Sequence, residues 1–237
     1  PAGQGVIDFL VHRVPAAPAH PDMPTYMWHA AIAPARQDLA HDCQFPALSY
    51  PSLIGLFVTG AAAGCGAALG VDLLARARQL ADFLIDHPAV TSGPLAGAPL
   101  STMSQDGTGG MFAQDRLTLV RLGWTGCTLL SLAEATGDAR YALYAERLGQ
   151  ILLDTQQTDG SWPYRVRLTD GAVLEPYTAA VAIALLLLER LEARSPDGPY
   201  TTALDRGLAW TLDNPVRTGL WQQMYEDVPS LEPYANL

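Results

Sequence analysis

Carboxylates and aromatic rings gather in three stretches of the sequence that lack helical periodicity. The densest stretch spans residues 213–229, where Trp221, Tyr225, Glu226 and Asp227 lie within seven residues. Paired carboxylates and a phenol can donate or accept protons at a reacting bond, and a carboxylate near a helix N-terminus stays ionised because of the helix dipole. The residues that we expect to be catalytic are Asp106, Asp115, Tyr225, Glu226 and Asp227.

Aromatic and basic side chains accompany these carboxylates, mainly in the stretches 87–116 and 157–176. Aromatic rings stack on the C–H faces of sugars, while polar groups hold the hydroxyls. Structural roles stand as alternatives: Trp162 could plug the end of a helical hairpin, and Glu226 could begin a helix. The residues that we expect to bind substrate are His29, Arg116, Arg121, Trp162, Tyr164, Arg165, Tyr177 and Trp221.

Two reactions fit this set of residues. Hydrolysis of a glycosidic bond needs a proton-donating acid and a second carboxylate, and the three stretches hold a surplus that includes Glu175. Elimination from a uronic sugar needs a base and a cation that stabilises the developing carbanion. The base would be Tyr164, Tyr177, Tyr225 or His29, and the cation Arg116, Arg121 or Arg165. The sequence leaves both reactions open.

The elements that must position these residues are helices. Apolar residues recur every three or four positions, opposite a polar face, in the segments 69–86, 139–156 and 200–212. A helix that is apolar nearly all round precedes each of them, at Ser52–Ala63, Leu117–Ala135 and Tyr177–Leu191. This alternation of buried and half-exposed helices predicts an all-α fold of inner and outer helices, an α/α toroid, rather than a four-helix bundle.

The expected hairpins are too few to close a ring. Repeats of this kind need enough units to bury both ends, and three hairpins make only about half of a closed toroid. We expect residues 50–237 to form this partial toroid and residues 1–49 to form a separate irregular or helical segment. The remaining part would come from a longer polypeptide or from a second copy in a homo-oligomer.

The composition excludes several classes of protein. All 14 basic residues are arginines, against 24 acidic residues, and the formal net charge is −10. Such a chain has little attraction for nucleic acid or an anionic membrane, so neither is an expected partner. The widely spaced Cys43, Cys65 and Cys127 predict free thiols, without a metal site or disulfides. No cofactor is expected, and the apolar run at 181–188 is too short to cross a bilayer; the compartment is not evident from the sequence.

Two motifs carry a resemblance to known families. The turn Glu134–Tyr141 (EATGDARY) and the loop Gln156–Tyr164 (QQTDGSWPY) resemble those of α/α-toroid carbohydrate-active enzymes, the six-hairpin glycosidases and related polysaccharide lyases. This resemblance covers about residues 50–237 and implies an α/α toroid that acts on a saccharide. The segment Gln157–Trp162 is also similar to the Gln-Trp motif of terpene cyclases, although it occurs once and the chain has no DxDD or DDxxD motif.

The predicted function is cleavage of glycosidic bonds in an oligo- or polysaccharide. A uronic-acid-containing glycan is favoured because Arg116, Arg121 and Arg165 lie nearest the expected cleft in a chain poor in positive charge. Two other classes stay open, a terpene-cyclase-like toroid domain and a non-catalytic helical-repeat binding module. An open acidic cleft would indicate a sugar, whereas a closed apolar pocket would indicate an isoprenoid.

Overall fold

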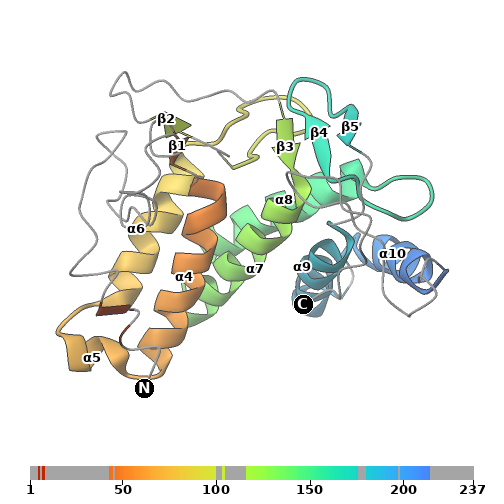
Figure 1. Cartoon of the computed structure of the whole chain (residues 1–237). Coiled ribbons are helices and arrows are strands. Elements are labelled where there is room, and N and C mark those ends of the chain that lie inside the picture. Colours follow the sequence, from red (N-terminus) through yellow and green to blue (C-terminus); the bar gives the residue numbers. More distant parts are fainter. Residues whose placement is uncertain are drawn as a thin grey trace. The chain divides into compact units, whose positions relative to one another are not determined.

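The computed structural model describes a mostly helical chain (Figure 1). The described residues are 5, 7–8, 43–44, 46–99, 103–104, 116–175, 180–196 and 198–213, and only the backbone is described at 43–44, 46–49, 103–104, Arg116 and Glu175. Two compact units divide the chain. The first comprises residues 1–91, 99–114 and 128–144, and the second comprises residues 92–98, 115–127 and 145–237.

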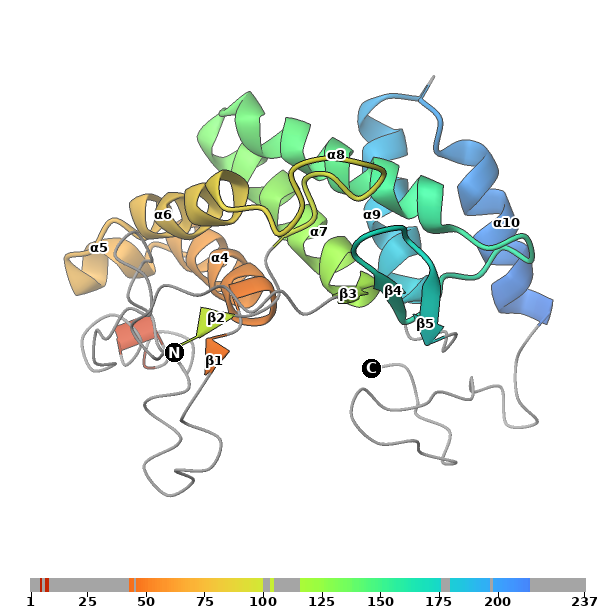
Figure 2. The ribbon, with the colours of Figure 1, turned by 90° about the horizontal axis from the view of Figure 1, so that it is seen from above.

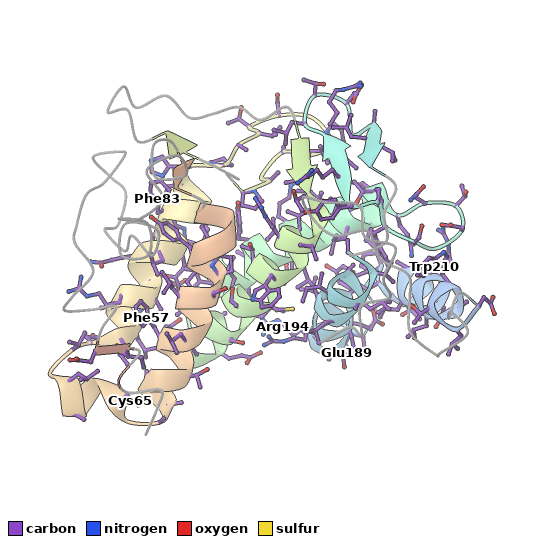
Figure 3. All side chains as sticks on the ribbon, viewed as in Figure 1. Phe57, Cys65, Phe83, Glu189, Arg194 and Trp210 are labelled. Carbon is purple, nitrogen blue, oxygen red and sulfur yellow. The ribbon has the colours of Figure 1, made fainter. Side chains whose placement is uncertain are left out.

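The first unit contains the helices α4 (Pro46–Ala62) and α6 (Leu73–Asp86), which lie side by side (Figures 1 and 2). Figure 3 labels Phe57 on α4 and Phe83 on α6, and both rings are buried. The ring of Tyr50 meets that of Phe83 edge-on, with 5.8 Å between centroids. This pair has the predicted character, because α4 is apolar on most sides and α6 buries one face and exposes the other.

Three further elements of this unit, one short helix and two short strands, were not predicted. The short helix α5 (Cys65–Leu69) separates α4 from α6 in the chain, and the strands β1 (Cys43–Gln44) and β2 (Met103–Ser104) form an antiparallel pair.

The start of the first apolar helix was predicted at Ser52, but α4 begins at Pro46 and runs through Pro51. Proline inside a helix removes a backbone donor. Tyr50 and Leu53, on either side of Pro51, are both buried.

The turn between α7 (Leu119–Thr136) and α8 (Ala139–Thr155) confirms the predicted joint. Gly137 has a positive φ of 70°, a conformation that ends helices at low cost in glycine. Asp138 then accepts a hydrogen bond from the backbone N–H of Arg140 at 2.9 Å, as an N-terminal cap does. The Arg140 side chain pairs with Asp82 at 3.2 Å and with Asp86, which attaches the start of α8 to α6 within the first unit.

The second unit contains α9 (Val181–Arg194) and α10 (Thr201–Asp213), again side by side (Figures 1 and 2). Glycines on three helices contact α9. A Cβ added at Gly123 or Gly126 of α7 would lie 2.7 Å from the Ile183 carbonyl oxygen or 2.4 Å from the Leu187 side chain. A Cβ added at Gly149 of α8 would lie 2.3 Å from the Leu191 side chain, and one added at Gly207 of α10 would lie 2.8 Å from the Leu185 side chain. These glycines allow neighbouring helices to approach the buried side of α9 closely.

A small sheet also belongs to the second unit and corrects one predicted boundary. The strands β3 (Arg116–Thr118), β4 (Arg165–Arg167) and β5 (Val173–Glu175) form an antiparallel sheet in that order. Leu117 was predicted to begin a helix, but it pairs with Val166 across the sheet and α7 begins at Leu119. Leu117 is buried in the strand, and an apolar residue suits a buried helix equally well. Its apolar character therefore could not distinguish strand from helix.

Cys65 and Cys127, whose side chains are described, are free thiols, as predicted for them. Cys65 is partly exposed and Cys127 is buried, and burial raises the pKa of the Cys127 thiol to about 11. Among the described residues, no group of His, Cys, Asp and Glu side chains could hold a metal ion. No described helix combines the length and apolar character needed to cross a membrane.

The contact at Gly123 makes a prediction about stability. Gly123→Ala should lower the free energy of unfolding by about 1–3 kcal/mol, because the new methyl group meets the rigid backbone of Ile183. Gly55→Ala is the matched control, since its Cβ would lie 3.4 Å from the Thr128 methyl carbon, an ordinary contact. Gly55→Ala should be neutral or stabilising by up to about 1 kcal/mol. Urea unfolding measures both, and equal midpoints would contradict the close approach of α7 and α9.

Candidate functional site

The side chains of four predicted site residues are described, and all four lie in the second unit: Arg121, Trp162, Tyr164 and Arg165. Arg116 is described by its backbone position in β3. The other predicted site residues lie outside the described residues and stay predictions: His29, Asp106, Asp115, Tyr177, Trp221, Tyr225, Glu226 and Asp227.

The loop Gln156–Trp162 is held closed by its own side chains and attached to α10. The Gln156 side-chain amide donates to the carbonyl oxygens of Gly160 at 3.0 Å and of Ala203 at 2.9 Å. Asp159 accepts hydrogen bonds from the backbone N–H and the hydroxyl of Ser161, at 2.9 and 2.7 Å. Arg206 of α10 donates to the Gln157 carbonyl. The loop therefore joins the end of α8 to α10.

Trp162 fills the space between these two helices. Its ring is 0% exposed, and its indole N–H donates to the Leu152 carbonyl near the end of α8 at 2.7 Å. A Cβ added at Gly207 of α10 would lie 2.8 Å from the ring. Trp162 thus has the position of a plug at the hairpin end, the structural alternative for this residue. Its ring presents no face on which a ligand could stack in this structure.

Tyr164 and Arg165 lie where this loop enters β4. The Tyr164 side chain is 2% exposed, and its hydroxyl has no hydrogen-bond partner among the described residues. Its carbonyl accepts from the backbone N–H of Leu119 at 3.0 Å, which joins β4 to the start of α7. The Arg165 guanidinium carbon lies 4.7 Å from the Tyr164 ring centroid, a cation–π contact.

The register of the sheet places three arginines on one face. Arg116 of β3 pairs with Arg167 of β4, and Thr118 pairs with Arg165. Leu117 and Val166, the residues between them, are both buried. Because successive residues of a strand alternate between the two faces, the arginines occupy the face opposite this buried pair. Arg167 lies in the predicted loop 157–176 but was not among the residues expected to bind substrate, and the alternation in Arg165–Arg167 is a strand signal that was read as loop.

Arg121 and Trp124 lie on α7. Arg121 is partly buried, and its carbonyl accepts from the Thr125 hydroxyl at 2.7 Å. Trp124 is 52% exposed, an unusual value for a tryptophan on an inner helix. Leu186 of α9 is 49% exposed. Sequence reasoning missed Trp124 because an apolar residue on an apolar helix is expected to be buried.

Sequence comparison yields a relative that matches only part of the chain. No protein-family model matches. An ent-copalyl diphosphate synthase from a Streptomyces species is 38% identical over 96 residues, which are 39% of this chain and 16% of the relative. The chain therefore spans a small fraction of that relative's length.

Comparison with solved structures identifies the fold. A cellobiose 2-epimerase from Spirochaeta thermophila matches with a TM-score of 0.61 and 12% identity, over 82% of this chain and 49% of that one. An alpha-1,2-mannosidase from Trichoderma reesei matches with a TM-score of 0.54 and 17% identity, over 77% and 39%. An alpha-amylase from Clostridium perfringens matches with a TM-score of 0.58 and 8% identity, over 97% and 60%.

These neighbours confirm the predicted fold class. They are carbohydrate-active enzymes of the six-hairpin, α/α-toroid architecture, and the chain corresponds to part of each. At identities of 8% to 17%, the likeness concerns the fold. Activity must be argued from the site, because one fold supports unrelated chemistries.

The buried position of Trp162 makes a second prediction about stability. Trp162→Phe should lower the free energy of unfolding by about 2–3 kcal/mol, because the smaller ring leaves a cavity and the Leu152 carbonyl loses its donor. Thr158→Ala, at an exposed position of the same loop, should change it by less than about 0.5 kcal/mol. Urea unfolding measures both. An unchanged midpoint for Trp162→Phe, combined with weaker saccharide binding, would instead indicate a stacking platform.

Proposed function

We propose that this chain contributes the substrate-binding part of a terpene-cyclase-like enzyme, which holds a prenyl diphosphate. The observation that carries this proposal is the 38% identity over 96 residues to an ent-copalyl diphosphate synthase. That identity is a relation between sequences, whereas the solved carbohydrate enzymes share only the path of the backbone, at 8% to 17% identity.

The contacts of the Gln156–Trp162 loop support the same proposal. The segment Gln157–Trp162 is similar to the Gln-Trp motif of terpene cyclases. The Gln157 carbonyl accepts a hydrogen bond from Arg206 of α10, and the Trp162 indole N–H donates to the Leu152 carbonyl of α8. A motif that joins neighbouring helices maintains the walls of a toroid without taking part in the reaction. The chain has no DxDD or DDxxD motif, so the proposal concerns binding and assigns no catalytic acid.

The character of α7 and α9 also fits an apolar substrate. The segments 119–130 and 181–188, which begin these helices, contain no acidic residue. Trp124 and Leu186 lie in these segments and are each about half exposed. A half-exposed tryptophan and leucine suit contact with a hydrocarbon chain, since burial of their apolar surface favours binding.

Binding of geranylgeranyl diphosphate tests this proposal. Isothermal titration calorimetry should detect binding to the 237-residue chain. Trp124→Ala should weaken the affinity by about tenfold or more, because a large apolar contact is lost. Leu143→Ala is the control, since Leu143 is exposed on the outer helix α8 and should leave the affinity unchanged. Absence of binding by the unaltered chain would overturn the proposal.

A second candidate is an enzyme that cleaves glycosidic bonds, by hydrolysis or by elimination from a uronic-acid-containing glycan. The names of the solved neighbours favour it, because a mannosidase and an amylase share this fold. In this candidate, the catalytic groups would be the carboxylates of Asp106, Asp115, Glu226 and Asp227. Arg165 would bind a carboxylate of the substrate. The substrate would be an oligo- or polysaccharide.

Glu226→Gln tests this second candidate. The change keeps side-chain volume and removes the charge, so a catalytic Glu226 predicts a loss of turnover of about 10²-fold or more with little loss of stability. A reducing-end assay and the absorbance of unsaturated uronates would be measured on acidic glycans, with Asp227→Asn beside it. Unchanged turnover with a lower melting temperature would assign Glu226 to helix capping.

A further inference from the structure

We propose that Glu189 of α9 ends a hydrocarbon-binding face shared by α7 and α9, and so selects against prenyl chains that extend past it. The choice of a prenyl ligand rests on the proposed prenyl diphosphate function. The shared face and the place of Glu189 on it are derived from helix geometry, from close contacts and from burial.

The close contacts of two glycines fix how α7 and α9 lie beside each other in the second unit. A Cβ added at Gly123 would meet Ile183, and one added at Gly126 would meet Leu187. Because these contacts advance together along both helices, the two helices run in the same direction. The same contacts define which side of each helix is turned toward the other.

The exposed apolar residues of the two helices share one face. Residues of an α-helix are rotated by about 100° each, so Trp124 lies about a third of a turn from the side of α7 that contacts α9. The exposed Ala182 and Leu186 are rotated about a quarter to a third of a turn from the contact side of α9, in the opposite sense. Opposite rotations on neighbouring parallel helices point to the same side of the pair. We call Trp124, Ala182 and Leu186 the hydrocarbon face.

Glu189 continues this face along α9. It follows Leu186 by three residues and precedes Ala193 by four, the spacing that aligns residues on one side of a helix. All three side chains are exposed, and Figure 3 labels Glu189 on this helix. Arg121 borders the hydrocarbon face on α7, but it is partly buried and has contacts of its own, so it is not counted in this face.

The chemistry of the surface changes at Glu189. The hydrocarbon face offers apolar area whose burial favours binding. A carboxylate loses its hydration when a hydrocarbon covers it, and a hydrocarbon returns no hydrogen bond. A prenyl tail therefore ends before Glu189. The anionic diphosphate lies at the other end of the face, because like charges repel.

Affinities for prenyl diphosphates of increasing length test this inference. Isothermal titration calorimetry on the full chain would use farnesyl, geranylgeranyl and geranylfarnesyl diphosphate, each one isoprene unit longer than the one before. Glu189→Leu should raise the affinity for the longest ligand relative to the shortest by about tenfold, because the added unit then meets an apolar side chain. Circular dichroism establishes that each variant is folded.

Two further variants separate the effect of Glu189 from a general gain in apolar surface. Glu189→Gln removes the charge and keeps a polar group, so its preference should fall between those of the native chain and of Glu189→Leu. Glu146→Leu is the matched control, because Glu146 is exposed on the outer helix α8 and should leave the preference unchanged. The inference is overturned if Glu189→Leu and Glu146→Leu show the same preference, or if Glu189→Leu favours the shorter ligands.

The outcome is separable from that of the proposed function. If the diphosphates bind but Glu189→Leu leaves the length preference unchanged, the role of Glu189 is overturned and the proposed function stands. Farnesol and geranylgeraniol, which carry no diphosphate, provide the converse test. If they bind with a length preference that Glu189→Leu shifts, while no diphosphate binds, the proposed function is overturned and the hydrocarbon face stands. If neither class of ligand binds, both are overturned.

Discussion

The packing of α9 is the constraint on which the second unit depends. Its first eight residues, 181–188, are all apolar, and Val181, Ala184, Leu187 and Leu188 are buried there. Gly123 and Gly126 of α7, Gly149 of α8 and Gly207 of α10 let three helices approach it closely enough. Side chains at these four positions would separate the helices, and the Gln156–Trp162 loop and the start of β3 would lose the spacing that they require.

The fold of this chain and its sequence identity indicate different classes of related protein. The backbone follows α/α toroids that act on carbohydrates, while the detectable sequence identity is to an ent-copalyl diphosphate synthase. Both facts are compatible, because a ring of helical hairpins supplies a cavity and its lining residues decide the ligand. In the described part of this chain, Trp124 of α7 and Leu186 of α9 are the half-exposed apolar side chains on these two helices.

Exposed ion pairs connect neighbouring segments within each unit. Arg140 pairs with Asp82 and Asp86 between outer helices, where exposed ion pairs add little stability but fix the relative position of two helix ends. Arg167 of β4 likewise pairs with a carboxylate, that of Asp170, at 2.9 Å.

The sequence alone determined the alternation of apolar and amphipathic helices, because a period of 3.6 residues and the Gly137–Asp138 joint are local properties. It also identified the Gln156–Trp162 loop, but the choice between plug and platform required the tertiary structure. Trp162 is buried because the Leu152 carbonyl and Gly207 meet it from different helices. The sequence could not predict the strand Arg116–Thr118 either. This strand forms by pairing with Arg165–Arg167, which lie about fifty positions away in the chain.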